Sequence, residues 1–384
     1  MELFYEVIFP IFSFSIVFCL GANFMTVEKK RLLILGTDGL PARYGGFETL
    51  VEQLSYTDYF SDGWDVDVYT SMNGRSSSPK KHGAFNIVYS KFQANGLASI
   101  MYDAEALRFG IRCNYDAIVC LGVSVGFALA FRKFFNFQGN IIVNVDGVEW
   151  RRAKWGFLAS HFLRLSEKIC VSQADLIIAD NDGIVGYLEQ EYKSIADKNI
   201  KMIPYGGDQF KSIVDANLLS TRVFCLSRIE PENNVDLILH AVADIGIDCT
   251  YFGNWNNSDY GVKLYNKFKD KIDLRSPEYD VSKLSKLRSE SPYYIHGHSA
   301  GGTNPSLVEA MHSGHTIVAY DCDYNRFTTE NQAFYFKDVH ELRELIQNIK
   351  DMSLVSNSMK MKEIAQRRYT WSEISNSYLR CIEE

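Results

Sequence analysis

The stretch YYIHGHSAGGTNPSLVEAM, residues Tyr293–Met311, carries the strongest structural signal in this chain of 384 residues. An apolar run ends at His296, a glycine-rich turn follows, and an apolar helical pattern begins after Asn304 and Pro305. Asn304 is a good N-cap, and Pro305 suits the first helical position, where its missing N–H costs nothing. The stretch therefore predicts a strand, a loop and a capped helix, which is the repeating unit of a parallel α/β sheet.

The same alternation of apolar runs and helical patterns extends on both sides of this stretch. The runs lie at 32–35, 66–69, 86–89, 117–121, 141–145 and 176–179 before the turn-rich segment Pro204–Asp208, and at 223–226, 249–252, 271–274, 293–296 and 316–320 after it. Strands that alternate with helices form a parallel sheet covered on both faces. We therefore predict an α/β protein of two Rossmann-like doubly wound domains, residues 31–205 and 206–370, which face a central cleft, with a C-terminal helix over 371–384.

Composition is that of a globular protein, with 46% apolar and 23% charged residues and a net charge of −7. The sequence has no strongly basic patch, so we expect no nucleic-acid partner. Eight cysteines include no Cys-x-x-Cys pair, and most lie inside apolar runs. This usage is typical of reduced, buried thiols in a cytoplasmic protein.

Residues 1–25 differ from the rest of the chain because they are almost continuously apolar. The segment Leu3–Met25 is long enough to span a bilayer, and the cations at Lys29–Arg31 would hold the following body on the cytoplasmic side. A signal peptide fits less well, since there is no basic region before a long apolar core. Two interpretations remain open: a single N-terminal transmembrane helix, or a mis-called start with Met25 as the true first residue.

Ligands of doubly wound domains bind beyond the carboxyl ends of the strands, so residues that follow strands are the candidate site. In Tyr293–Met311, free N–H groups of Ser306 and Leu307 would point out of the helix and favour an anion such as a diphosphate. Glu309 lies one turn further, where a carboxylate suits ribose hydroxyls better than phosphate. A capped core helix alone would explain the apolar residues, but not Gly301-Gly302 or Glu309.

A second glycine-rich loop, Gly36–Thr49, joins the first predicted strand to a helix and has the context of a phosphate loop. Its glycine spacing does not match the dinucleotide fingerprint, and the second strand ends in Tyr69-Thr70-Ser71 without the acidic residue that would hold a ribose. Both points argue against a nicotinamide dinucleotide. The alternative is a tight turn that needs glycine for backbone reasons alone.

Arg228 follows the first strand of the second predicted domain. A fixed cation there could contact a diphosphate, an interaction worth about 1.5–3 kcal/mol. The alternative is a surface ion pair with Glu230 or Glu232, worth under about 1 kcal/mol.

Two carboxylates, Asp146 and Glu149, follow the strand at 141–145 and could serve an acceptor hydroxyl. The basic and aromatic run 151–155 either touches a lipid headgroup or begins a solvated helix. Two Asp-x-Asp triplets lie at strands and suggest structural roles, and no residue spacing matches a zinc site. We predict no metal.

Four motifs together resemble the retaining glycosyltransferases of family 4, which have the two-domain GT-B fold, and in particular their rhamnosyltransferase-like branch. They are GTDGLPARYGGFETLVEQL (36–54), VDGVEWRRAKW (145–155), SRIEPENN (227–234) and GGTNPSLVEAM (301–311). The resemblance covers most of the chain from about residue 31, and the first motif is specific to that branch.

The resemblance implies roles for particular residues. Asp146, Arg228 and Glu309 would be catalytic, and the acceptor side would include Arg43, Tyr44, Asp146 and Glu149. Donor binding would involve Gly45, Gly46, Arg228, Asn233, Gly301, Gly302, Thr303, Asn304, Ser306, Leu307 and Glu309.

Three positions depart from the family pattern. Gly301 stands where the family has the first glutamate of a Glu-x7-Glu pair, and Asn233 stands where it has a lysine. Asp146 takes the place of a histidine found in many members. Backbone N–H groups of 301–303 would then replace the missing side-chain contact.

The resemblance also implies a reaction: transfer of a hexosyl group with retention, by front-face attack, with no metal and no cofactor beyond the nucleotide diphosphate sugar that is the donor. It favours dTDP-rhamnose as donor and a polyprenyl-linked or saccharide acceptor in bacterial polysaccharide or O-antigen biosynthesis, at the inner face of the cell membrane. Two alternatives are a sugar-nucleotide epimerase of the same fold and a noncatalytic membrane-associated scaffold. A dehydrogenase is disfavoured by the missing fingerprint.

Overall fold

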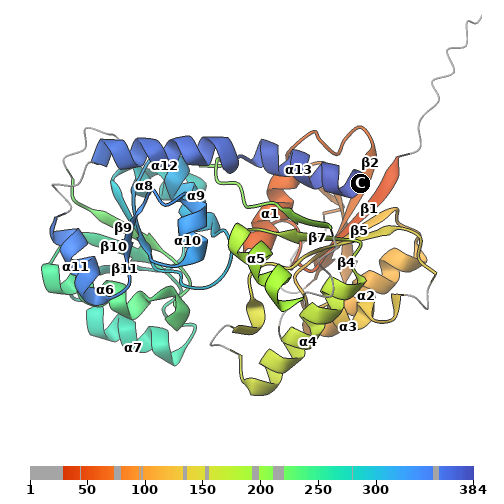
Figure 1. Cartoon of the computed structure of the whole chain (residues 1–384), viewed down its shortest axis with the longest axis horizontal. Helices are drawn as coiled ribbons and strands as arrows, with labels where there is room; N and C mark the ends of the chain where they lie inside the picture. The colour runs from red at the N-terminus through yellow and green to blue at the C-terminus, as the bar shows by residue number, and fades with distance from the viewer. Residues whose placement is uncertain are drawn as a thin grey trace, which may run out of the picture.

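The computed structural model describes residues 29–43, 45–72, 79–94, 96, 98–132, 136–151, 155–192, 199–210, 220–278, 280–348 and 354–384. Two α/β domains lie side by side along the long axis of the molecule (Figure 1). The apolar segment 1–25 and Tyr44 lie outside the described residues. Within the described part, no helix combines the length and apolar character needed to cross a membrane.

The first domain is built on an eight-stranded sheet in the order β3-β4-β2-β1-β5-β6-β7-β8, in which only β3 runs antiparallel to its neighbour. The strands are β1 (Lys30–Leu35), β2 (Trp64–Ser71), β3 (Lys81–His82), β4 (Phe85–Ser90), β5 (Ala117–Leu121), β6 (Asn140–Asn144), β7 (Leu176–Ala179) and β8 (Asn199–Met202). The helices are α1 (Gly46–Ser55), α2 (Ala98–Arg112), α3 (Gly126–Leu129), α4 (Phe157–Gln173) and α5 (Asp182–Glu191).

Both faces of this sheet are buried, because successive side chains of a strand point to opposite faces. Leu32 and Ile34 of β1 belong to the core on the α1 face, whereas Leu33 and Leu35 belong to the core under α2 and α4. A continuous apolar run therefore marks a strand that is covered on both sides.

The second domain has a six-stranded, fully parallel sheet in the order β11-β10-β9-β12-β13-β14. Its strands are β9 (Val223–Leu226), β10 (Cys249–Phe252), β11 (Asp273–Arg275), β12 (Tyr293–His296), β13 (Thr316–Tyr320) and β14 (Phe334–Phe336). Its helices are α6 (Val235–Ile245), α7 (Asp259–Phe268), α8 (Val281–Ser289), α9 (Pro305–His312), α10 (Asp323–Thr328), α11 (Val339–Gln347) and α12 (Leu354–Arg368). Two apolar clusters again cover the two faces of the sheet.

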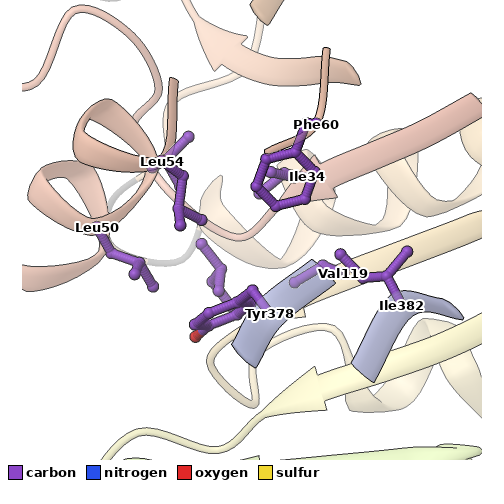
Figure 2. Close-up of a pocket in the computed structure, with 9 residues that line it drawn as sticks. Ile34, Leu50, Leu54, Phe60, Val119, Tyr378 and Ile382 are labelled. Carbon is purple, nitrogen blue, oxygen red and sulfur yellow. The ribbon is translucent and has the colours of Figure 1, made fainter. Parts of the chain in front are cut away.

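The last helix, α13 (Trp371–Glu383), returns to the first domain after α12 has packed on the second (Figure 1). Its apolar side chains join the core on the α1 face. A cavity of about 10 Å³ remains between α13, α1, β1 and β5, and its lining is apolar apart from the hydroxyl of Tyr378 (Figure 2). The first domain is thus completed by residues from the far end of the chain.

The two predicted doubly wound domains are confirmed, and the predicted strands recur within a few residues. Three strands were not predicted: β3, β8 and β14. They lie at sheet edges and are only two to four residues long. β3 and β8 also contain polar residues, whereas β14 is an aromatic run of only three residues.

Candidate active site

The loops that follow β6 and β7 in the first domain meet the loop that follows β12 in the second. A Cβ atom on Gly147 would lie 2.7 Å from the Cα of Gly301, and one on Gly302 would overlap the carboxylate of Asp180. Thr303 Oγ1 donates a hydrogen bond to the backbone oxygen of Asp180 at 2.5 Å. The carboxyl ends of the two sheets, where ligands of this architecture bind, therefore share one junction.

Gly301 has a φ of +111°, a conformation that side chains with a Cβ rarely adopt. The space around a Cβ at this position is open. The glycine is therefore required by the backbone, which gives a physical reason for the missing glutamate at position 301. Gly302 is required by the approach of Asp180 instead.

Helix α9 begins as predicted, with Asn304 as its N-cap and Pro305 in the first turn. The N–H groups that we expected to be free are both bonded within this helix start. Ser306 N–H donates to Asn304 Oδ1 at 3.1 Å, and Leu307 N–H donates to the Asn304 backbone oxygen at 3.0 Å. Ser306 and Leu307 are buried, and Leu307 belongs to the core. Any anion here would have to share N–H groups with the cap.

Glu309 is buried in the first turns of α9, and both of its carboxylate oxygens have partners. Arg288 Nη2 lies 2.5 Å from Oε2, and Gln209 Nε2 donates to Oε1 at 2.7 Å. Burial raises the pKa of Glu309 above its usual value, although Arg288 acts in the opposite direction. Each oxygen keeps a second lone pair, so the carboxylate can still accept hydrogen bonds from hydroxyl groups.

Arg288 lies at the end of α8 and is fully buried, at 0% exposure. Its guanidinium lies 4.4 Å from the ring centre of Phe210 and 5.7 Å from that of Phe224. Among the described residues, its Nε and Nη1 atoms have no hydrogen-bond partner. A buried cation of this kind depends on the charge of Glu309 and on the faces of the two rings. Neither Arg288 nor Gln209 was predicted.

The loop after β9 leaves Arg228 partly exposed but buries Asn233. Arg228 is about a third exposed, with Nε 3.7 Å from Glu230 Oε2, so the predicted alternative of an ion pair with Glu230 is present. Asn233 is buried, and its Nδ2 donates to the Arg228 backbone oxygen at 2.8 Å. The Asn233 side chain therefore holds its own loop in shape, and its expected contact with the donor stays a prediction.

The glycine-rich loop after β1 is braced by Glu48 of α1. Glu48 Oε1 accepts hydrogen bonds from Thr37 Oγ1 and from the Asp38 N–H, both at 2.8 Å, and burial raises its pKa. Gly45 has a φ of +124°, and a Cβ there would lie 2.1 Å from Glu48 Oε2. The predicted Gly45 is thus required by the backbone and by Glu48.

The other residues of this loop lie at different depths. A Cβ on Gly46 would come within 3.3 Å of the Tyr205 ring, so this glycine packs on the segment between the domains. Arg43 is exposed, and Tyr44 lies outside the described residues. Burial, followed by the negative charges of Asp146 and Asp180, raises the pKa of the Tyr205 hydroxyl.

Asp146, on the predicted acceptor side, has a left-handed backbone with φ +59°. Its N–H donates to Asn144 Oδ1 at 3.0 Å, and Asn144 Nδ2 donates to the Tyr378 hydroxyl at 2.6 Å. Left-handed conformations of residues other than glycine are costly and often occur at functional sites. Helix α13 therefore supports the Asp146 loop, a role that we did not predict. Glu149 accepts a hydrogen bond from Trp155 Nε1 at 3.1 Å.

Two chain crossings join the domains beside this site. Gly207 N–H donates to the Tyr369 backbone oxygen at 2.9 Å, and the Trp371 N–H donates to Asp208 Oδ1 at 2.8 Å. Gln209 Oε1 accepts from Trp371 Nε1 at 2.7 Å, while its Nε2 bonds Glu309. The crossing and the candidate donor site therefore share one side chain.

The two Asp-x-Asp triplets have structural roles. Asp67 accepts a hydrogen bond from the Tyr115 hydroxyl at 2.5 Å, and Asp321 pairs with Arg326 and Lys337. The described residues contain no group of three or more His, Cys, Asp or Glu side chains that could hold a metal ion. The expectation of a metal-free reaction remains a prediction.

The structure thus brings Asp146, Gly147 and Asp180 of the first domain to Gly301–Thr303 of the second. Glu309 lies at the linker crossing, and Gly46 packs on Tyr205 of the same segment. Arg228 and Asn233 belong to the neighbouring loop of the second sheet, which bonds the β12 loop because Ser299 donates to the Glu232 backbone oxygen at 3.0 Å.

Comparisons with known proteins support the fold. Residues 29–208 match the family model described as "Domain of unknown function (DUF1972)". No curated protein sequence matches the chain.

Solved structures with the same architecture cover nearly the whole chain. Sucrose-phosphate synthase from Thermosynechococcus elongatus is 16% identical, with a TM-score of 0.77 over 93% of this chain and 98% of that one. The trehalose-6-phosphate protein from E. coli bound with UDP-2-fluoro glucose is 10% identical, with a TM-score of 0.70 over 92% and 99%. Alr3699/HepE from Anabaena in complex with UDP-glucose is 16% identical, with a TM-score of 0.67 over 92% and 99%. The chain has the GT-B fold.

Proposed function

We propose that this protein is a glycosyltransferase that uses a nucleoside diphosphate sugar as donor and binds it on the second domain. The observation that carries the proposal is Glu309, a buried carboxylate held by Arg288 and Gln209 at the start of α9, next to the junction of the two sheets. A carboxylate fixed in this way suits two neighbouring ribose hydroxyls. Solved GT-B structures in complex with UDP-2-fluoro glucose and UDP-glucose support this donor class.

The proposed reaction breaks the bond between the anomeric carbon and the diphosphate oxygen and forms a bond to the acceptor oxygen. Arg228, exposed enough to reach a ligand, stabilises the negative charge that develops on the leaving diphosphate. The acceptor hydroxyl proton passes to the departing phosphate oxygen, in a front-face attack that retains the anomeric configuration and needs no metal. Asp146 lies on the opposite domain and orients the acceptor hydroxyl.

For the finer specificity, we propose that the donor is dTDP-rhamnose and that the chain belongs to the rhamnosyltransferase-like branch of glycosyltransferase family 4. The acceptor is a polyprenyl-linked or other saccharide of bacterial polysaccharide or O-antigen biosynthesis, met at the inner face of the cell membrane. The motif GTDGLPARYGGFETLVEQL, residues 36–54, supports these proposals through its resemblance to that branch.

The first experiment is a thermal-shift screen of the full chain against nucleoside diphosphates and their sugars. A ligand at about 100 times its dissociation constant adds about 2.7 kcal/mol of stability. We expect one sugar nucleotide to stabilise the protein and Arg228→Ala to abolish most of this shift. Arg222→Ala is the matched control, because Arg222 lies just before β9 and forms surface ion pairs with Asp248 and Glu290.

Transfer is then measured with the ligand that stabilises the chain. Release of nucleoside diphosphate that requires an acceptor supports a transferase, whereas conversion of the donor without acceptor would indicate an epimerase. If no sugar nucleotide binds, the noncatalytic scaffold takes precedence, in agreement with the uncharged residues at positions 233 and 301.

A further inference from the structure

Helix α4 has an outward face made of large apolar and basic side chains. Phe157 and Leu158 in its first turn are 76% and 82% exposed, and Leu165 is 50% exposed. Arg164 and Lys168 are exposed on the same face. The only acidic residue of α4, Glu167, is buried and accepts hydrogen bonds from the hydroxyls of Tyr187 and Tyr192. We call Phe157, Leu158, His161, Arg164, Leu165 and Lys168 the α4 face.

The orientation of the helix is fixed by its inner side, so this face cannot turn inward. Ser166 Oγ donates to the Val123 backbone oxygen at 2.5 Å, and a Cβ on Gly126 would lie 2.2 Å from the backbone oxygen of Ser166. Phe162 stacks on Phe127 with ring centres 4.5 Å apart. The exposure of the α4 face therefore follows from the packing of the domain core.

The surroundings extend the same character. A groove beside α4 is lined by His161, Arg164, Leu165, Lys168, Glu191 and Tyr192. The one carboxylate there, Glu191, is paired with Arg164. Phe131, just beyond α3, is 58% exposed. Clustered apolar side chains on a surface mark a site of interaction, unlike single exposed ones.

The α4 face lies close in sequence and space to the acceptor-side loop. Residues 145–156 connect β6 directly to α4, and the first turn of α4 projects from the lower edge of the first domain, on the side facing the second domain (Figure 1). Ser160 of α4 donates a hydrogen bond to the Trp150 backbone oxygen at 2.7 Å, so a partner bound to this face would lie beside the segment that follows Asp146.

We propose that the α4 face docks the protein onto an anionic lipid surface. Phe157 and Leu158 enter the boundary between headgroups and acyl chains, while Lys168 contacts headgroup phosphates; Arg164 is already paired with Glu191. This combination of apolar and basic side chains with no exposed carboxylate on the helix matches a membrane that bears negative charge. The docking itself requires no catalysis; only the idea that it presents a lipid-linked acceptor to Asp146 rests on the proposed function.

The test uses the full chain with vesicles of phosphatidylglycerol and phosphatidylcholine, and with vesicles of phosphatidylcholine alone. Hydrogen exchange is read at α4, so that contacts made elsewhere in the chain do not enter the measurement. We expect the amides of 157–168 to become protected with the mixed vesicles only.

Variants test the two kinds of contact separately. Phe157→Ser/Leu158→Ser should raise the lipid concentration needed for half-maximal protection at least about tenfold, because each side chain contributes about 1.5 kcal/mol or more when buried. Lys168→Gln should raise this concentration about fivefold, since one basic residue near an anionic surface contributes about 1 kcal/mol. Val262→Ser/Met359→Ser, which removes exposed apolar side chains of the second domain, should have no effect.

Three results would overturn the proposal: no protection of α4 by vesicles, equal protection with both lipid compositions, or protection without vesicles that grows with protein concentration. The last would identify a second copy of the chain as the occupant. Sugar-nucleotide thermal shifts should be unchanged in Phe157→Ser/Leu158→Ser, so failure of docking and failure of the transferase proposal can be told apart.

Discussion

Replacing Arg288 by methionine tests how the candidate donor site is held. The change keeps an apolar stem but removes the cation that lies 2.5 Å from the Glu309 carboxylate. Removal of one partner of a buried ion pair leaves an uncompensated charge and typically costs about 3–5 kcal/mol. Because Arg288 is fully buried and Glu309 nearly so, little solvent screening reduces this value, and we expect a loss of about 3 kcal/mol at pH 8.

The loss should depend on pH. The pKa of Glu309 is already raised in the folded protein, and removing Arg288, which lowers it, will raise it further. A carboxyl group with a raised pKa binds more protons in the folded than in the unfolded state, so stability falls as pH rises from the unfolded to the folded pKa. The variant should therefore lose less stability at pH 5 than at pH 8.

Urea-dependent hydrogen exchange at the amides of β12 measures this effect, because it reports unfolding of the second domain alone. Arg222→Met is the control, with a surface ion pair worth under about 1 kcal/mol. The double variant Arg288→Met/Glu309→Gln removes the unpaired charge and should regain most of the loss. If Arg288→Met costs no more than Arg222→Met, or the double variant regains nothing, the pair does not hold the site.

Three further changes follow from the structure. Gly301→Glu restores the family residue but should lower the free energy of unfolding by about 1–3 kcal/mol, because φ at this position is +111°. Urea denaturation measures the loss, and Gly186→Glu, in α5 with open space around it, is the control. Burial raises the pKa of Asp103 from 3.8 to about 7, so the stability of the wild-type protein should fall as pH rises from about 4 to 7. Asp103→Asn should lack this fall, and a variant with the same pH profile as the wild type would contradict the reasoning. Val51→Ile adds a methyl group to the cavity under α13 and should raise the free energy of unfolding by about 0.8 kcal/mol, whereas a loss would mean that the cavity cannot accept it.

The fold was largely predictable because its central strands are buried on both faces. Runs such as Ala117–Leu121 can be recognised as strands from their own residues alone. The N-cap of α9 was also predictable, because Asn304 and Pro305 act locally, within one turn of helix. Edge strands such as β8 are half polar, and only their neighbour in the sheet makes them strands.

The support of the site was not predictable, because its members come from distant parts of the chain. Arg288 is followed in sequence by polar residues typical of an exposed helix end, and only the fold places it beside Glu309. Tyr378 reaches Asn144 from 234 residues away. Asn233, which we predicted for the donor, is buried, and the sequence did not show that its side chain bonds its own loop.

Gln209 connects these observations. Its side chain bonds Trp371, where the chain returns to the first domain, and Glu309, which we propose for the ribose. If the domains rotate about the crossings at 207–209 and 369–371, Gln209 can move with Trp371 or with Glu309. Its hydrogen bond to the other residue is then lost. The free energies of domain rotation and of donor binding are therefore linked through one amide, and a ligand that holds Glu309 in place also favours the domain arrangement in which both of these bonds are made.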